Sequence, residues 1–184
     1  MLYELRTSIL NELAIVDLSS IKEKDYEEYY NYFIEGLNDR KFLEHKKLVF
    51  TAQQGYNTNN IEKIDYLKCS SPVPIFSQQF VEILQDKLRQ DMEFIPCKVI
   101  CDNISYDFYV GRILNFIQLI DKEKSEYYEL SEGEKIMDIP VFSSSVNTDF
   151  YIARDSEEKN LYAITDKMKE VLIEHNFNIK LKEV

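Results

Sequence analysis

The chain has 184 residues and a formal net charge of −11, with many Tyr and Phe residues and no Trp. This length suits one well-buried core and is short for two domains. The charge argues against direct binding to nucleic acid or to an anionic membrane, because both need clustered Lys and Arg. Two readings of the acidity stay open: simple solubility, or an acidic face that attracts a basic protein.

The first clear helix is predicted over Lys22–Leu37. Its aromatic and apolar side chains recur every three or four residues and form one core-facing stripe: Tyr26, Tyr29, Tyr30, Phe33 and Leu37. Tyr32 lies off this stripe, near Glu28 and Glu35 in helical register. An exposed Tyr among acidic residues is typical of an interface, so we expect Glu28, Tyr32 and Glu35 to form one candidate surface for a partner.

A second helix is predicted to begin after Ser77 and to end near Gln90. Ser is a favoured N-cap, and Phe76 and Val81 fit a hydrophobic staple across it. A strand over residues 93–101, the turn Asp102-Asn103 and a following strand then predict a β-hairpin. Shorter strands are expected at residues 1–6, 12–18, 47–51 and 61–67.

The stretch from Tyr106 to Ile120 is apolar on both alternating sets of side chains. A strand with two apolar faces belongs inside a sheet that is covered above and below. Gly111 interrupts the run, which suggests a bulge or bend. Asp121 ends it, and Ser125 follows four residues later, so we expect these two residues to form a structural corner that binds turn amides.

The segment from Asp121 to Asp138 is the most acidic part of the chain. It holds the second candidate surface for a partner: Glu126, Tyr128, Glu129 and Glu132. Tyr supplies a large contact area at low entropic cost, and exposed carboxylates speed the encounter with a basic partner.

The C-terminal part is predicted to contain strands at 139–143, 150–153 and 161–164, a helix capped by Thr165, and a last strand at 178–182. Strand and helix do not alternate regularly. We therefore expect an α+β fold: one domain over residues 1–184, with a mainly antiparallel sheet and two or three helices packed on it.

No catalytic motif is found: the sequence lacks a nucleophile elbow, a phosphate-binding glycine loop and a His-Glu-x-x-His segment. We expect no catalytic residue, no metal site and no cofactor. Cys69, Cys97 and Cys101 lack paired metal-ligand spacing, and His45 and His175 are too few to complete a zinc site. The first residues do not resemble a signal peptide, and the cysteines suit a reducing compartment, so we expect a cytoplasmic protein.

Several short motifs together resemble a family of immunity proteins from bacterial polymorphic toxin systems. They are Leu-Ile-Asp-x-x-x-Ser, with Asp121 and Ser125, then Phe150–Arg154, and Tyr162–Lys167 leading into the last helix. The resemblance covers residues 74–184, and residues 1–70 are divergent. Where that family often has Gly before its last strand, this chain has Asn176-Phe177-Asn178, and Asn also tolerates the left-handed conformation.

This resemblance implies a non-enzymatic immunity protein that binds and neutralises a cognate toxin domain, encoded by the adjacent gene, without nucleic acid or membrane. Fold and composition alone do not lead to this function. Two alternatives remain: an acidic adaptor or subunit of another protein complex, and a hydrolase with an unrecognised acidic site. The identity of the gene beside this one discriminates between them.

Overall fold

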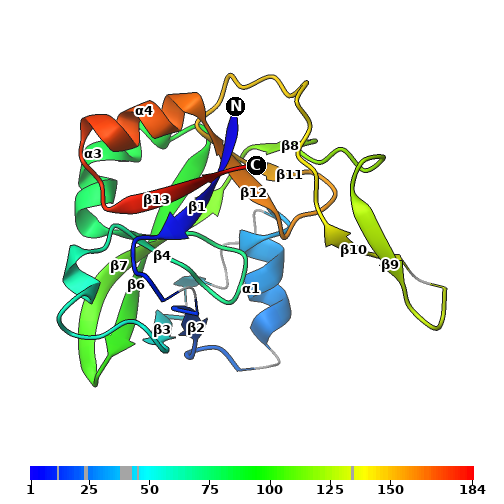
Figure 1. The fold of residues 1–184 in the computed structure, drawn as a ribbon. Coiled ribbons are helices and arrows are strands. Elements are labelled where there is room, and N and C mark those ends of the chain that lie inside the picture. Colours follow the sequence, from blue (N-terminus) through cyan, green and yellow to red (C-terminus); the bar gives the residue numbers. More distant parts are fainter. Residues whose placement is uncertain (12, 23–24, 38–42, 45, 134) are drawn as a thin grey trace.

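The computed structural model describes all residues except 12, 23–24, 38–42, 45 and 134. Within the described part, one sheet has six strands in the order β2-β3-β6-β7-β5-β4. Their bounds are β2 Val16–Leu18, β3 Leu48–Ala52, β4 Tyr66–Leu67, β5 Ile75–Ser77, β6 Met92–Cys101 and β7 Ile104–Ile113. The long β6–β7 hairpin is the centre of this sheet (Figure 1).

The predicted turn of that hairpin is present. Asp102 and Asn103 join β6 to β7 with φ angles of 50° and 66°. Two consecutive left-handed residues match the turn that best suits the right-handed twist of a hairpin, and Asp and Asn tolerate that conformation.

A second sheet has five described strands in the order β13-β1-β12-β11-β8. Their bounds are β1 Leu2–Thr7, β8 Phe116–Ile117, β11 Ile152–Asp155, β12 Tyr162–Thr165 and β13 Ile179–Glu183. The first and last strands of the chain therefore lie side by side, as Figure 1 shows. Asn176 has a φ of 54°, so this Asn takes the left-handed conformation between α4 (Asp166–Glu174) and β13.

The helices α1 (Tyr26–Phe33), α3 (Gln78–Leu88) and α4 pack on these sheets. Ser77 caps α3 as predicted, because its side chain accepts a hydrogen bond from the backbone N–H of Phe80 at 3.1 Å. Thr165 occupies the N-cap position of α4 but makes no capping bond. Its buried hydroxyl donates instead to the carbonyl of Phe150, which ties β12 to the chain before β11.

The expected strand over residues 61–67 is wrong in its first half. Ile61–Lys63 forms a short 3-10 helix, η2, and only Tyr66–Leu67 is strand. The α1 helix is also shorter than predicted, with Leu37 outside it and 55% exposed.

The apolar stretch after Tyr106 is divided between the two sheets. On β7, Phe108 and Val110 face the core beneath α1, while Ile113 faces the core shared with α3 and α4, so this strand has two buried faces as predicted. The strand ends there, and Leu114 is exposed. The chain then enters the other sheet as β8, so the prediction of one continuous strand up to Ile120 is wrong.

Gly111 lies in β7 where side chains from the neighbouring strand β6 and from the segment before β5 leave no room for a Cβ atom. A Cβ atom there would lie 2.4 Å from the sulfur of Met92 and 3.0 Å from Pro74 Cγ. The register of β6 and β7 continues through this residue, so it makes neither a bulge nor a bend. It is a point of close packing that a larger side chain would disrupt.

The described elements form one α+β domain of mixed sheets packed with helices. Pairing is mostly antiparallel, with parallel pairs at β3–β6 and β11–β8 among the described strands. The three cysteines are buried and free. In the described residues, no helix is both long and apolar enough to cross a membrane.

Candidate functional site

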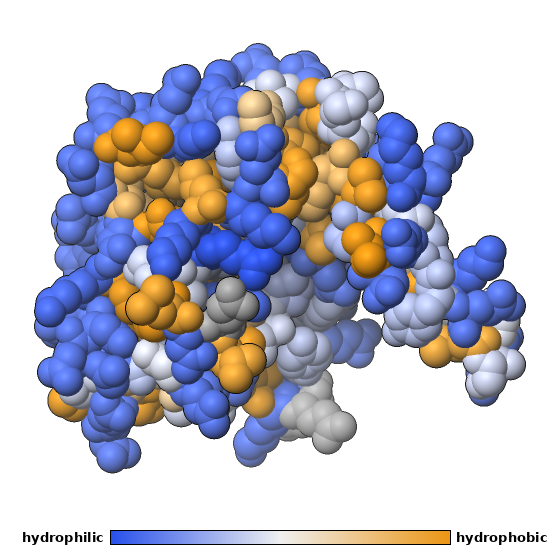
Figure 2. All heavy atoms as spheres, viewed as in Figure 1, coloured by the Kyte–Doolittle hydropathy of each residue, from blue (hydrophilic) through white to orange (hydrophobic). Residues whose placement is uncertain are grey.

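A two-stranded hairpin projects from this domain. The strands are β9 (Glu126–Glu129) and β10 (Lys135–Ile139), and they pair only with each other in the described structure. Figure 1 shows them extending away from the two larger sheets, and Figure 2 shows open space between the hairpin and the body. An isolated hairpin is marginally stable in water, so its projection needs a firm attachment at the root.

Side chains on the hairpin combine charge with exposed apolar area. Large apolar and aromatic side chains are 38–51% exposed: Tyr127, Tyr128, Leu130, Ile136 and Ile139. Among its acidic residues, Glu126, Glu129, Glu132 and Asp138 are exposed. An exposed apolar patch with a polar rim is typical of a surface that binds another protein.

The register places the second predicted surface on this hairpin. Tyr128 lies opposite Ile136, and Glu126 lies opposite Ile139, so these four side chains share one face. Glu129, opposite Lys135, belongs to the other face, and Glu132 lies in the turn. The four predicted residues are therefore neighbours on one projecting element, although they do not share one face.

The root is held by the corner that the sequence placed at Asp121 and Ser125. The backbone carbonyl of Asp121 accepts hydrogen bonds from the Ser125 N–H at 3.0 Å and from the Ser125 hydroxyl at 2.8 Å. The Ser125 Oγ in turn accepts from the Val141 N–H at 2.9 Å, and the Asp121 N–H donates to the Val141 carbonyl. Ser125 thus joins the two chain segments that enter and leave the hairpin.

The Asp121 side chain is more exposed than Ser125 in this corner. Its Oδ2 accepts from Lys124 Nζ at 2.7 Å, and its Oδ1 accepts from the Lys124 N–H at 3.3 Å. The hydrogen bond from the Lys124 ammonium holds the pKa of Asp121 below its usual value. The carboxylate is therefore ionised at neutral pH and serves as an acceptor in the turn.

Replacing Asp121 by Ala is expected to destabilise the protein measurably, because the turn loses the acceptor of the Lys124 N–H. Urea unfolding of wild type and variant measures the difference. We expect any loss of partner binding to follow from the disturbed root. Unchanged stability with abolished binding would show instead that Asp121 contacts the partner directly.

Asp155, at the end of β11, fixes the segment that leads into the corner, and sequence reasoning missed it. It is 1% exposed, and its Oδ2 accepts the backbone N–H groups of Leu119 and Ile120 at 2.7 and 2.9 Å. Its Oδ1 accepts those of Glu157 and Glu158 at 2.9 and 2.6 Å. A buried carboxylate needs such donors to offset its lost hydration. The one available signal was an Asp two residues after a predicted strand.

The first predicted surface, on α1, is wrong as a surface. Tyr32 is 1% exposed: its ring packs edge-on against Phe33, and the Arg112 guanidinium lies 4.3 Å from its centroid. Glu35 is half-buried and forms an ion pair with Lys159. Of the three residues, only Glu28 is exposed.

Arg112 explains why Tyr32 turns inward. This buried residue of β7 donates from Nε to the Tyr32 carbonyl at 3.0 Å and from Nη2 to the Gly36 and Leu37 carbonyls at 3.1 and 3.2 Å. It therefore satisfies carbonyls in the last turn of α1 and just beyond it, where a helix has no intrahelical donors. This position draws the last turn of α1 onto the sheet, and the Tyr32 hydroxyl donates to Glu93 at 3.2 Å.

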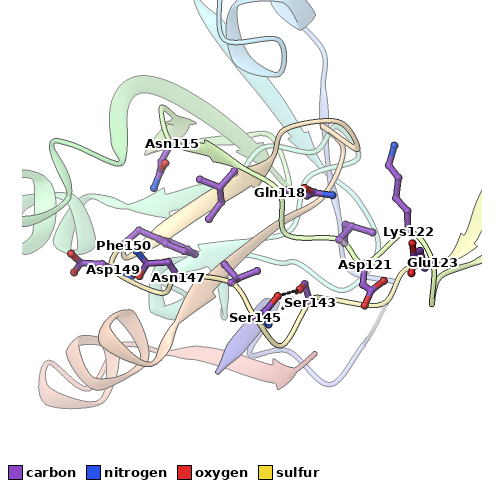
Figure 3. Close-up of a pocket in the computed structure, with 13 residues that line it drawn as sticks. Asn115, Gln118, Asp121, Lys122, Glu123, Ser143, Ser145, Asn147, Asp149 and Phe150 are labelled. Carbon is purple, nitrogen blue, oxygen red and sulfur yellow. Dashed lines mark hydrogen bonds between the residues drawn. The ribbon is translucent and has the colours of Figure 1, made fainter.

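A polar groove of about 790 Å³ lies on one side of the root (Figure 3). It is lined by the segments 115–123 and 143–150, and its carboxylates include Asp121 and Asp149. A hydrogen bond from Lys167 lowers the pKa of Asp149, as Lys124 does for Asp121. Both carboxylates are therefore ionised at neutral pH, and neither is poised to donate a proton. Ser143 and Ser145 hydrogen-bond to each other at 2.9 Å.

The described residues contain no group of three or more His, Cys, Asp or Glu side chains arranged to hold a metal ion. The hairpin offers exposed apolar area, acidic side chains and strand edges that pair with no other described strand. No protein-family model matches the chain, and no curated protein matches it.

Proposed function

We propose that this protein is an immunity protein that binds and neutralises a cognate toxin domain in the cytosol, and that the β9–β10 hairpin is its main contact. One observation carries the proposal: the most acidic segment of the chain is built as a projecting hairpin with exposed aromatic side chains. The motifs at Asp121, Ser125 and the C-terminal strands, which resemble the immunity family, supply the kind of partner.

Charge favours a basic partner. Residues 126–139 hold Glu126, Glu129, Glu132, Glu134 and Asp138 against the single Lys135. Such a surface steers a positively charged protein and speeds association. An acidic adaptor for another complex would use the same surface, so the gene beside this one decides the kind of partner: a toxin-like reading frame supports immunity, and a metabolic operon argues against it.

The binding test is kinetic and uses the toxin domain encoded beside this gene. Reversing two charges on the hairpin, by Glu129→Lys with Glu132→Lys, is expected to slow association about tenfold at low salt. The wild-type association rate should fall as salt rises, because exposed charges are screened beyond about 8 Å at physiological ionic strength.

The matched control reverses two exposed charges on α3 and α4, by Asp86→Lys with Glu170→Lys. It changes the net charge by the same amount at a distance from the hairpin (Figure 1). Unfolding free energies of both double variants should stay within about 0.5 kcal/mol of wild type per substitution. Equal slowing by both variants would show general charge steering without a hairpin contact.

A further inference from the structure

A cleft of about 940 Å³ lies beside the hairpin root and shares no lining residue with the polar groove. Four tyrosines from distant parts of the chain line it, and we call it the tyrosine cleft: Tyr26, Tyr30, Tyr66 and Tyr162. Its outer wall is the end of β10 and the chain after it, from Ile139 to Phe142. The hairpin and the body thus contribute to one hollow of a size typical of binding sites.

The base of the cleft is aromatic, with the Arg154 guanidinium 5.6 Å from the Tyr162 ring centroid, and the charged side chains Glu4, Lys68, Lys182 and Glu183 also line the cleft. The hydroxyls of Tyr66 and Tyr162 hydrogen-bond to each other at 3.0 Å. Burial raises the pKa of Tyr162 to about 12 and raises that of Tyr66 well above its ordinary value. Both phenols therefore remain protonated at physiological pH. Such a base suits an aromatic or aliphatic side chain, and Tyr26, 45% exposed at the mouth, adds apolar contact area.

The strand beside the cleft has an open edge. Figure 1 shows β10 between β9 and the body, so its unpaired edge is on the body side. Within the described structure, the backbone hydrogen bonds of 135–139 go to β9 alone. An open edge can accept a strand from another protein, with main-chain hydrogen bonds for affinity and side-chain pockets for specificity.

We propose that an extended segment of the basic toxin pairs with the open edge of β10 and places an apolar or aromatic side chain in the tyrosine cleft. Lys or Arg residues flanking that side chain then lie near the carboxylates of the hairpin. A β10 of five residues offers about 16 Å of edge, enough for a strand of similar length. This inference rests on the proposed function and adds the mode of binding.

Charge argues against a second copy of this chain as the occupant. Each copy has a net charge of −11 and an acidic hairpin, so edge-to-edge pairing of two hairpins would place like charges side by side. A basic segment meets complementary charge at the same place.

The test places a large side chain at the rim of the tyrosine cleft, so that it fills part of the cleft. Ser70 and Asn160 both line it and are both exposed. Ser70→Trp and Asn160→Trp are each expected to weaken binding of the neighbouring toxin domain about tenfold or more, as loss of a central anchor does. The matched control is Ser145→Trp, which places the same bulk in the polar groove, outside the tyrosine cleft, and it should bind within about twofold of wild type.

Hydrogen exchange supplies an independent readout. Strand addition predicts slower exchange of the backbone amides of residues 135–139 when the toxin domain is bound. Cleft-filling variants that bind like wild type, together with unchanged exchange in β10, would overturn the inference. A self-associated protein that Ser70→Trp converts to monomer would also overturn it, in favour of a second copy.

The two proposals fail in different ways. If wild-type protein does not bind the toxin domain, the proposed function fails and the binding mode fails with it. If wild type binds and the hairpin charge variant slows association, but both cleft-filling variants bind normally and exchange in β10 is unchanged, only the inference about the cleft and the open edge is wrong.

Discussion

Replacing Asp155 by Ala is expected to lower the free energy of unfolding by roughly 3–5 kcal/mol, because it leaves several buried backbone donors without an acceptor. The carboxylate accepts the N–H groups of Leu119 and Ile120 before the corner, and those of Glu157 and Glu158 after β11. Water cannot readily replace it, since Asp155 is 1% exposed.

Urea unfolding measures this loss, with two further variants for comparison. Asp155→Asn keeps one acceptor oxygen and the shape of the side chain, so its loss should be smaller. Asp149→Ala removes a carboxylate that is 79% exposed and paired with Lys167, and it should cost far less than Asp155→Ala, because a solvent-exposed ion pair contributes little. An Asp155→Ala variant as stable as Asp149→Ala would show that the buried hydrogen bonds contribute little.

Features that depend on neighbours in the sequence were predictable. The Ser77 cap, the Asp102-Asn103 turn and the left-handed Asn176 each follow from local backbone chemistry. The α+β class followed from the spacing of strands and helices. The two buried faces of β7 followed from its alternating apolar side chains.

Features that depend on distant residues were not predictable. Helical periodicity places Tyr32 off the apolar stripe, yet Arg112, eighty residues away in the chain, draws it against the sheet. An apolar run also cannot show where one sheet ends and the next begins, so the break at Leu114 was missed. Burial of Asp155 depends on amides 35 and 36 residues away.

The hairpin shows the same limit at the candidate site. Composition identified Glu126, Tyr128, Glu129 and Glu132 as a candidate surface, because acidic and aromatic residues are concentrated there. The projection of the hairpin from the body was not predictable. The sequences of β9 and β10, EYYE and KIMDI, do not show which elements pack against them, and in the structure almost all of their side chains are exposed. Their position follows from the root, where Ser125 and Val141 hydrogen-bond.

Excision of the hairpin is expected to have the largest effect on binding. The hydrogen bond between Ser125 Oγ and Val141 N–H brings the two ends together at 2.9 Å, so a Gly-Asn-Gly turn can replace residues 126–140. Among residues 126–140, those that the structure describes are all exposed or half-buried. The domain should therefore keep its fold, with a free energy of unfolding within about 1 kcal/mol of that of wild type.

The most direct measurement is the dissociation constant of this excised variant for the toxin domain encoded by the neighbouring gene, beside that of wild type. We predict binding at least about a hundredfold weaker, a loss of roughly 2.7 kcal/mol or more, with unfolding still cooperative. A folded excised variant that binds and neutralises the toxin as wild type does would contradict the claim that the hairpin is the main contact.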